Sequence, residues 1–312
     1  MELQNKRIVV TGGAGFLGRH VVQKLTDMGA RDIFVPRSSS FDLRRREDVR
    51  RMYEAFEPEV VIHLAAVCGG IGANQKEPGR FLYENLVMGA EMIDAAKDFK
   101  IQKFVQVGTV CSYPKYCPTP FKETDIWNGY PEETNAPYGI AKKTLMEMCR
   151  AYRSQYGLNA ITVIPVNLYG PFDNFSSETS HVIPALIRKC LEAKASGEQS
   201  ITVWGSGKAS REFLYVDDCA EGIVLATQHY ESSDPVNLGT GAEISISGLI
   251  EIIKQVTRYT GTIVYDASKP EGQPRRCLDV TRAKDFGFTA KTSLKVGLQD
   301  TAGWYEGIGC AQ

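Results

Sequence analysis

A tyrosine and a lysine, four residues apart, form the clearest candidate for proton transfer in this chain. Tyr138 and Lys142 lie in the run Tyr-Gly-Ile-Ala-Lys, and this spacing places both side chains on one face of a helix. A phenol with an ordinary pKa of ~10 is a poor acid–base group at neutral pH unless a neighbouring cation favours its phenolate form. We therefore interpret Tyr138 as a proton-exchanging residue and Lys142 as the cation beside it. The lysine can also hold the ribose of a cofactor.

A hydroxyl and a thiol precede this pair in the run Val-Gly-Thr-Val-Cys, directly after a predicted strand. The hydroxyl of Thr109 can polarise a substrate carbonyl near the phenol. Cys111, taken alone, is more often a small buried residue than a reactive one. The same holds for the histidines, and we assign His20 and His63 to packing and His229 to the surface.

A glycine-rich turn near the start of the chain predicts a phosphate-binding loop. The run Thr-Gly-Gly-Ala-Gly-Phe-Leu-Gly follows a buried strand and opens an amphipathic helix. Glycines let the backbone approach a pyrophosphate closely, and the helix N-terminus favours its negative charge. We predict dinucleotide binding by Gly12, Gly15, Phe16, Leu17 and Gly18.

The end of the second predicted strand favours NADP over NAD. An NAD site usually offers an acidic residue there for the ribose 2′-hydroxyl, but the strand ends in Val-Pro-Arg-Ser-Ser. Arg37 and Ser38 can hold a 2′-phosphate, because a guanidinium forms paired hydrogen bonds with phosphate oxygens. The alternative for Arg37 is an ordinary solvated arginine. Asp42 and Leu43 are weaker candidates for contact with the adenine.

Short β-branched runs alternate with helical patterns through the first half of the chain, which predicts a doubly wound parallel α/β sheet of the Rossmann type. The predicted strands cover residues 7–11, 32–35, 60–64, 104–107 and 160–166, and the longer predicted helices cover residues 47–57, 79–98 and 137–156. We expect a dinucleotide-binding domain over residues 1–170. Residues 171–312 should form mainly a smaller α+β substrate lobe, with some strands and helices returning to the first domain.

Composition excludes several classes of protein. The net charge of −1, without a basic run, lacks the footprint of a nucleic-acid-binding protein. No apolar run approaches the ~20 residues that a membrane helix needs, and we expect no signal peptide. The eight cysteines form no Cys-x-x-Cys pair, so we predict reduced thiols in a cytoplasmic protein and no metal centre.

Further motifs make the chain resemble the extended short-chain dehydrogenase/reductase superfamily and, within it, the GDP-L-fucose synthase family. These enzymes are NADPH-dependent epimerase/reductases that act on GDP-4-keto-6-deoxy-D-mannose. The motifs that carry the resemblance, in chain order, are Gly69-Gly70-Ile71, Cys111-Ser112-Tyr113-Pro114-Lys115, Asn167-Leu168-Tyr169-Gly170-Pro171, Asp173-Asn174-Phe175, Ser180-His181-Val182-Ile183-Pro184, Trp204-Gly205-Ser206-Gly207, Arg211-Glu212-Phe213 and Lys269-Pro270.

The resemblance implies roles for residues that the motifs alone leave open. Cys111, as a thiolate favoured by protonated His181, would remove a proton beside the keto group, and His181 would return one on the opposite face. Thr109, where the family commonly has serine, and Tyr138 would stabilise the enolate oxygen. Further implied ligands are Asn167, His181 and Lys142 for NADPH, and Lys189, Trp204, Arg211 and Asp279 for the GDP-sugar. A homodimer through the helices at 79–98 and 137–156 is implied as well.

Four alternatives remain beside this expectation. A 4,6-dehydratase would need carboxylic acids at the positions of Val110 and Cys111, and a UDP-sugar 4-epimerase would need neither Cys111 nor His181. The same chemistry on another GDP-4-keto-sugar, such as a 6-deoxyheptose or a colitose precursor, is not excluded by the sequence, because residues 69–75 and Thr109 can reshape the sugar pocket. A non-catalytic NADP-binding regulator would be expected to lose the tyrosine, lysine, cysteine or histidine, yet all four are present.

Overall fold

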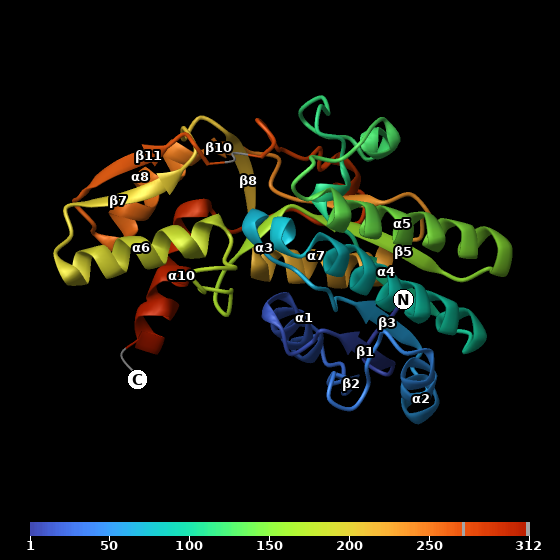
Figure 1. Ribbon diagram of the computed structural model, residues 1–312. Coiled ribbons are helices and arrows are strands. Elements are labelled where there is room, and N and C mark those ends of the chain that lie inside the picture. The colour runs from blue at the N-terminus through green and yellow to red at the C-terminus, as the bar shows by residue number, and fades with distance from the viewer. Residues whose placement is uncertain (270–271, 310–312) are drawn as a thin grey trace.

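Six parallel strands form the central sheet in the computed structural model, which describes residues 1–269 and 272–309 (Figure 1). The strands are β1 (Arg7–Thr11), β2 (Asp32–Phe34), β3 (Val60–His63), β4 (Lys103–Val107), β5 (Ala160–Pro165) and β9 (Val236–Leu238). Their order is β2-β1-β3-β4-β5-β9, and every neighbouring pair is parallel. The predicted doubly wound α/β fold is confirmed. Pro270, from the last motif above, and Cys310 lie outside the described residues.

Helices cover both faces of this sheet, because successive side chains of a strand point to opposite sides. The helices are α1 (Phe16–Asp27), α2 (Arg46–Phe56), α4 (Pro78–Asp98), α5 (Ala136–Tyr156) and α7 (Val216–His229). On β1, Val10 packs in one core with Val21 of α1, while Val9 packs in a second core with Ile93 of α4. Helices α1 and α7 therefore cover one face, and α2, α4 and α5 cover the other.

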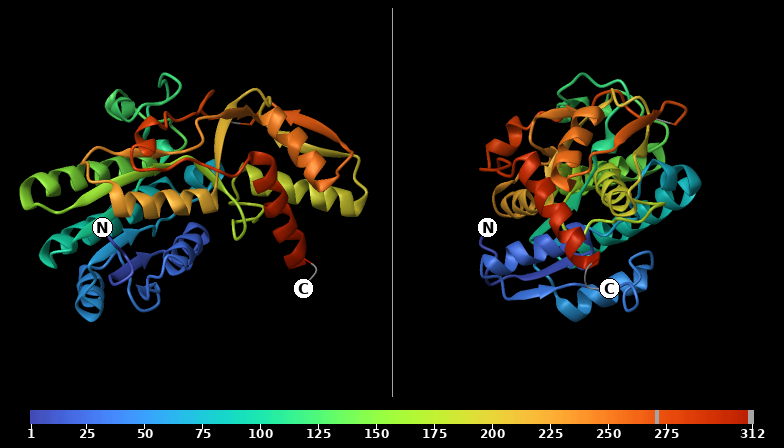
Figure 2. Two further views of the ribbon diagram at one scale, coloured as in Figure 1. Left: turned by 180° about the vertical axis from the view of Figure 1, so that it is seen from behind. Right: turned by 90° about the vertical axis from the view of Figure 1, so that its left-hand side faces the viewer.

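A second lobe lies beside the first, as the front and rear views show (Figures 1 and 2). It is built from α6 (Val182–Ser196), β7 (Ser200–Trp204), α8 (Ile246–Thr257), β11 (Thr262–Asp266) and α10 (Leu294–Gly309). Strands β7 and β11 pair in parallel, and the helices pack around them in a separate apolar core. Although α7 and β9 follow residue 171, they belong to the first lobe. None of the helices formed by the described residues is long and apolar enough to cross a membrane.

A small three-stranded sheet joins the two lobes. It contains β6 (Asn167–Tyr169), β8 (Ser210–Tyr215) and β10 (Glu243–Ser245), in the order β10-β8-β6. The remaining short helices are α3 (Ile71–Lys76), α9 (Thr281–Lys284) and the 3₁₀ turns η1 (Val110–Ser112) and η2 (Glu123–Trp127).

One buried carboxylate holds this junction together. Glu212, on β8, is fully buried and accepts backbone N–H groups from Thr240, from Gly241 at 2.7 Å and from Leu278 at 2.6 Å. The Thr240 hydroxyl donates to the same carboxylate at 3.2 Å. Burial raises the pKa of Glu212, and these donors oppose that shift. The carboxylate thus fixes two chain segments, at 240–241 and at 278, against β8.

We predict that Glu212→Ala destabilises the fold, because it leaves three backbone N–H donors without their acceptor, the donor of Leu278 in a fully buried position. The free energy of unfolding should fall by about 3 kcal/mol or more. The free energy of unfolding should fall less for Glu212→Gln, because this variant keeps one oxygen acceptor. Denaturant titration measures both variants against Glu251→Ala, a change at an exposed position of α8 that should stay within about 0.5 kcal/mol of the parent. Equal stability of Glu212→Ala and Glu251→Ala would contradict the assigned role.

Candidate active site

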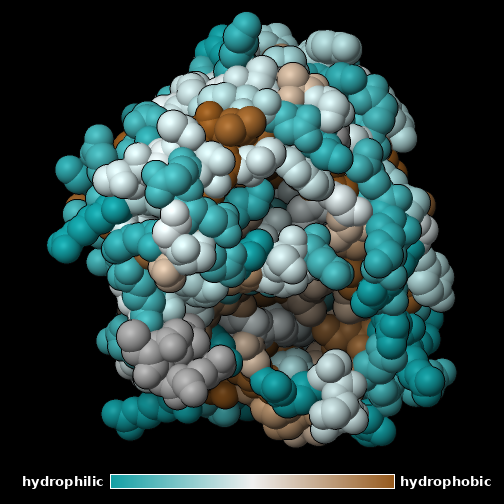
Figure 3. Space-filling model, turned by 60° about the vertical axis from the view of Figure 1, so that its left-hand side comes forward, coloured by the Kyte–Doolittle hydropathy of each residue, from teal (hydrophilic) through white to brown (hydrophobic). Residues whose placement is uncertain are grey.

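A deep cleft separates the two lobes at the carboxyl ends of the parallel strands, where open α/β sheets bind ligands. Its volume is about 1460 Å³, larger than the ~300–1,000 Å³ typical of a site for one small ligand. Figure 3 shows one face of the molecule hollowed, with apolar residues on the inner walls and polar residues around the rim. The cleft has room for two large ligands side by side.

The glycine-rich turn forms one end of this cleft, between β1 and α1. Gly12 has a φ of +69°, which glycine adopts without strain. A Cβ atom on Gly18 would lie 2.1 Å from the carbonyl oxygen of Gly12, so a side chain there would break the turn. Gly15 is the N-cap of α1, and Phe16 and Leu17 follow on the cleft wall. The turn offers a close backbone approach beneath a helix N-terminus, the arrangement that suits a pyrophosphate.

Beyond the turn, Arg37 and Ser38 are exposed and line the cleft, as does Leu43. Within the described part of the chain, Arg37 forms no ion pair. Asp42 also lies on the cleft wall, but Arg44 donates to both of its oxygens, at 2.9 and 2.8 Å. This pairing lowers the pKa of Asp42 to about 2. The guanidinium at 37 is therefore available to a ligand, whereas the carboxylate of Asp42 is already paired with Arg44.

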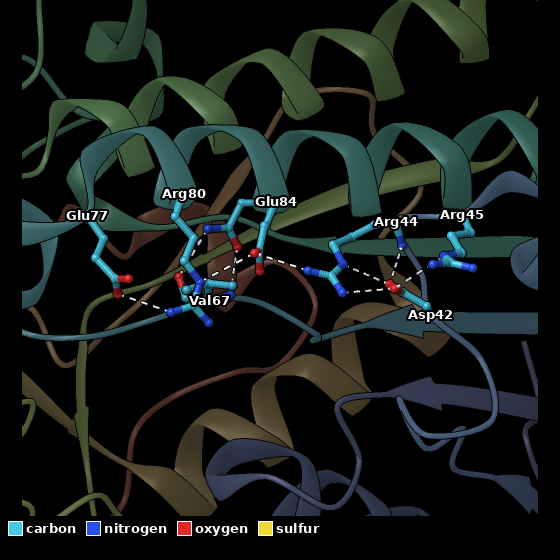
Figure 4. A network of polar contacts seen from close by, with 8 residues as sticks. Asp42, Arg44, Arg45, Val67, Glu77, Arg80 and Glu84 are labelled. Carbon is cyan, nitrogen blue, oxygen red and sulfur yellow. Dashed lines mark hydrogen bonds and ion pairs between the residues drawn. The ribbon is translucent and has the colours of Figure 1, made fainter.

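The Asp42–Arg44 pair begins a row of alternating charges along the rim of the cleft (Figure 4). Arg44 also pairs with Glu84 of α4 at 3.1 Å, Glu84 with Arg80 at 3.3 Å, and Arg80 with Glu77 at 3.0 Å. The row ties the loop after β2 to α4 and so fixes the wall beside Arg37.

The predicted hydroxyl and thiol lie on η1, where the chain leaves β4. The Thr109 hydroxyl accepts the backbone N–H of Cys111 at 3.2 Å and begins the 3₁₀ turn. Ser112 donates to the carbonyl of Gly139 at 3.0 Å, which docks η1 on the start of α5. A Cβ atom on Gly139 would lie 2.3 Å from the carbonyl oxygen of Cys111. Glycine inside Tyr-Gly-Ile-Ala-Lys is therefore what lets the thiol and Tyr138 approach each other.

Tyr138 and Lys142 lie on one face of α5 at the cleft wall, as the spacing predicts. Burial raises the pKa of Tyr138 well above its usual range, neighbouring Cys68 acts in the same direction, and the Thr109 hydroxyl opposes it. Burial also lowers the pKa of Lys142 to about 8, and its ammonium donates to the carbonyl of Val107 at 3.0 Å. We expected the lysine to favour a phenolate. The raised pKa of Tyr138 instead favours the phenol, which is the proton-donating form.

His181 is the N-cap of α6 and reaches the same cleft from the second lobe. Its imidazole is open to the cleft, yet burial by the surrounding walls, reinforced by the charge of Arg276, lowers its pKa. The loop before it lies against Gly70, whose N–H donates to the Thr179 carbonyl at 3.2 Å. His181 is therefore mainly neutral near pH 7. This shift disfavours the protonated form that we expected to place a positive charge beside Cys111.

Two residues in this region escaped the sequence analysis. The exposed thiol of Cys68 lies 3.5 Å from the Tyr138 hydroxyl. The guanidinium of Arg276 lies 3.8 Å from the Cys111 sulfur and 3.3 Å from the Asn167 amide oxygen. Both are brought there by loops whose sequences give no periodic signal, so only the fold places them.

The second lobe contributes three of the four residues expected to bind a GDP-sugar. Lys189, Trp204 and Arg211 line the cleft, and Trp204 is 53% exposed, with the Lys269 ammonium 5.7 Å from the centre of its ring. The Lys189 ammonium donates to the Thr202 carbonyl at 2.8 Å. Asp279 does not line the cleft; its carboxylate accepts the N–H of Thr281 at 2.9 Å at the start of α9.

The remaining histidines lie outside the reacting region. His63 is fully buried against Thr11 at 2.8 Å, and His229 is exposed. His20 does more than pack, because it pairs with Asp217 at 2.6 Å and contacts the Pro171 carbonyl at 3.2 Å. It thereby anchors the start of the loop that leads to His181.

Comparisons with known proteins place this geometry among sugar-nucleotide enzymes. The model of the "NAD dependent epimerase/dehydratase family" matches residues 8–239. A GDP-L-fucose synthase from Sinorhizobium fredii is 41% identical over 95% of this chain and 94% of its own. Among solved structures, a GDP-L-fucose synthetase from Naegleria fowleri bound to NADP has a TM-score of 0.90 and 29% identity, covering 98% of this chain and 96% of its own. A GDP-6-OMe-4-keto-L-xylo-heptose reductase from C. jejuni has a TM-score of 0.92 and 27% identity, covering 99% of each chain.

Proposed function

The chain belongs to the NAD dependent epimerase/dehydratase family, among the relatives of the GDP-L-fucose synthases, and we propose that it makes GDP-L-fucose. The proposed reaction is the 3,5-epimerisation and 4-reduction of GDP-4-keto-6-deoxy-D-mannose with NADPH. One observation carries the proposal: Cys111 and His181 share a cleft with Tyr138 and Lys142. A simple reductase needs the phenol and the lysine but has no use for a thiol and an imidazole around the same substrate.

The residues present fit NADPH. The turn at Gly12 and Gly18 leaves no room for side chains where a pyrophosphate would lie. Arg37, without an ion-pair partner in the described chain, lies at the end where a 2′-phosphate is expected. When bound, NADPH would supply the hydride that reduces C4. Lys142, Asn167 and His181 line the cleft toward Tyr138, where they would hold the nicotinamide end.

The proton steps follow from the keto group of the substrate. A 4-keto group makes the hydrogens on C3 and C5 acidic, and each removal leaves an enolate whose charge rests on the oxygen at C4. Thr109 and Tyr138 can donate hydrogen bonds to that oxygen. Cys111, as a thiolate, would remove the proton from one face, and His181 would return a proton on the other. The lowered pKa of His181 makes its protonated form a stronger proton donor, and exchange with solvent would restore the proton after each transfer.

The reduction uses the same oxyanion site. Once both centres are inverted, hydride addition at C4 turns the carbonyl oxygen into an alkoxide. Tyr138, kept as a phenol by burial, would protonate it, with Lys142 beside it. One hydroxyl pair thus serves the enolate and then the alkoxide, which explains how two different reactions can use one cleft.

The second lobe would hold the nucleotide part of the substrate. Lys189 and Arg211 supply positive charge for a diphosphate, and Trp204 supplies a flat apolar surface for the base or sugar. We propose residues 1–170 as the cofactor-binding part and residues 171–312 mainly as the substrate-binding part. Since NADPH and free thiols are both maintained in a reducing compartment, we propose that the protein works in the cytoplasm.

We predict that the purified protein, with GDP-4-keto-6-deoxy-D-mannose and NADPH in heavy water, yields GDP-L-fucose carrying deuterium at C3 and C5. Nuclear magnetic resonance of the product measures both positions. Cys111→Ser should reduce deuterium incorporation at least a hundredfold, while Tyr138→Phe should block reduction and still permit exchange. A product that carries no deuterium would show a reductase without epimerase activity.

The alternative is a substrate with a different sugar, and two residues near Tyr138 support it. The Cys68 thiol lies 3.5 Å from the phenol, and Thr109, which carries one methyl group more than serine, lines the same cleft. The likeness to a heptose reductase is also high over the whole chain. A panel of GDP-4-keto-sugars, with kcat/KM measured for each, decides between them. A preference for a heptose substrate would replace the proposed one and leave the roles of the residues unchanged.

We predict that Arg37→Ala weakens NADPH binding at least tenfold and changes NADH binding by less than threefold, because only NADPH carries the 2′-phosphate. Quenching of intrinsic fluorescence measures both dissociation constants. Arg31→Ala, at an exposed position outside the cleft, is the matched control. If the two cofactors weakened equally, Arg37 would not be the residue that selects NADPH.

We also propose a homodimer formed through α4 and α5. Leu82 and Tyr83 of α4 and Tyr156 of α5 are large apolar residues left exposed on these helices, Tyr83 by 64%. Large apolar side chains left exposed on a pair of packed helices can be covered by a second copy of the chain. Light scattering at micromolar concentration should give twice the mass of the chain. Tyr83→Glu should lower the measured mass toward that of a single chain. A monomeric mass for the parent protein would refute the dimer.

A further inference from the structure

The guanidinium of Arg276 is a buried positive charge with an unusual set of partners. Arg276 is only 7% exposed, and among residues 1–269 and 272–309 no carboxylate lies within ion-pair distance of it. Burying a charge without a counterion is costly. A site that maintains such a charge is built to face a negative group.

The sulfur of Cys111 is the group that Arg276 faces. One terminal nitrogen lies 3.8 Å from that sulfur and 3.3 Å from the Asn167 amide oxygen, and the Nε atom lies 3.3 Å from the Gln273 amide oxygen. The two amide oxygens are neutral, so they orient the guanidinium without cancelling its charge. The thiol is then the one partner in this set that can become an anion.

The chain around Arg276 fixes this arrangement on both sides. Its carbonyl accepts the backbone N–H of Glu212 at 2.9 Å, which aligns the segment with β8. The side-chain amide of Gln273 donates to the carbonyls of Pro114 at 2.9 Å and Lys115 at 2.8 Å, just beyond the cysteine turn. One segment therefore clamps the loop that carries Cys111 and also delivers a charge to its sulfur.

We propose that Arg276 is a positioning residue for the acid–base pair: its guanidinium fixes the Cys111 sulfur and supplies the permanent positive charge that favours the thiolate. A cation beside a sulfur is what turns a cysteine into a usable base. The other titratable groups facing this region are Tyr138 from α5 and His181 from the start of α6. Tyr138 is held as a neutral phenol and His181 is mainly neutral, so neither provides that charge.

Arg276 acts on the second member of the pair as well. Its charge contributes to the lowered pKa of His181, which makes the protonated imidazole a better proton donor. A single guanidinium thus favours a thiolate on one residue and proton release from the other. The catalytic role inferred for Arg276 rests on the proposed epimerisation. Its charge and its contacts with Cys111, in contrast, are present in the protein without substrate.

The first experiment uses no substrate and therefore tests the inference independently of the proposed function. Iodoacetamide reacts with thiolates, and peptide mass spectrometry follows Cys111 and Cys68 separately in one sample. In Arg276→Gln, the rate for Cys111 at pH 7.5 should fall at least fivefold, and its rise with pH should move to higher pH. The rate for Cys68, an exposed thiol beside Tyr138, should change by less than twofold. An unchanged rate and pH profile for Cys111 would overturn the inference.

Two further variants separate charge from structure. Arg276→Lys keeps the charge but loses the forked contacts, and it should recover part of the Cys111 rate. Arg282→Gln removes an arginine of the same terminal region that donates to the Pro235 carbonyl at 2.6 Å, outside the cleft, and it should leave both thiols unaffected. If Arg276→Lys behaved like Arg276→Gln while thermal unfolding of both matched the parent, the charge would not be what matters, and the proposal would fail.

The second experiment links the charge to catalysis. With the keto-sugar in heavy water, Arg276→Gln should lose at least tenfold of the deuterium exchange at C3 and C5, with the NADPH dissociation constant unchanged. Exchange at the parental rate would contradict the role of Arg276. If the parent protein itself showed no exchange while the alkylation result held, the proposed function would fail and the assignment of the charge to Cys111 would stand.

Discussion

The rest of the cleft depends on the hydrogen bonds that the buried carboxylate of Glu212 accepts. It lies on β8, in the small sheet between the lobes, and its oxygens gather backbone N–H groups from two segments that are distant in the sequence. A carboxylate can satisfy several donors at once, which a neutral side chain of the same size cannot. By holding Leu278, it sets the path of the segment that carries Arg276 and Gln273. The position of a charge beside Cys111 thus depends on a hydrogen-bonded joint well outside the reacting centre.

The chemistry collects at the carboxyl ends of the strands because parallel strands bring their following loops to one edge. The glycine turn follows β1, the Arg37 loop follows β2, and the turn with Thr109 and Cys111 follows β4. Helix α5 then adds Tyr138 and Lys142 from above this edge. Since the rigid sheet fixes all these loops together, the hydroxyl, thiol and phenol are positioned before any ligand arrives.

Sequence reasoning recovered most of the first lobe, because its signals are local. The β-branched runs gave five strands of the main sheet to within one or two residues, and the turn at Gly12 and the pair Tyr138 and Lys142 lie where their patterns indicate. The second lobe is harder, because its short strands pair over long sequence distances. Strand β9, whose partner β5 lies some seventy residues earlier, carries only three residues and no periodic signal.

The electrostatics were less predictable than the positions. From sequence we expected Lys142 to favour the phenolate form of Tyr138 and His181 to supply a positive charge to Cys111. Both expectations considered only the charges of neighbouring groups and left burial out. In the structure, burial shifts both pKa values the other way: it raises that of Tyr138 and lowers that of His181. Arg276 could not be found from sequence, since the fold brings it to Cys111 from 165 residues away. Solvent exposure and long-range contacts are the two quantities that local patterns do not contain.

The distribution of the reacting groups between the lobes has a mechanical consequence. Thr109, Tyr138 and Lys142 stand together on the sheet side, whereas His181 enters from the far side at the head of α6. A motion that opened the cleft would carry the imidazole, together with the second-lobe residues proposed to hold the GDP-sugar, away from Thr109, Tyr138 and Lys142. Inversion and reduction therefore both require the two lobes to close on one substrate, and opening would serve the entry of the sugar nucleotide and the release of the product.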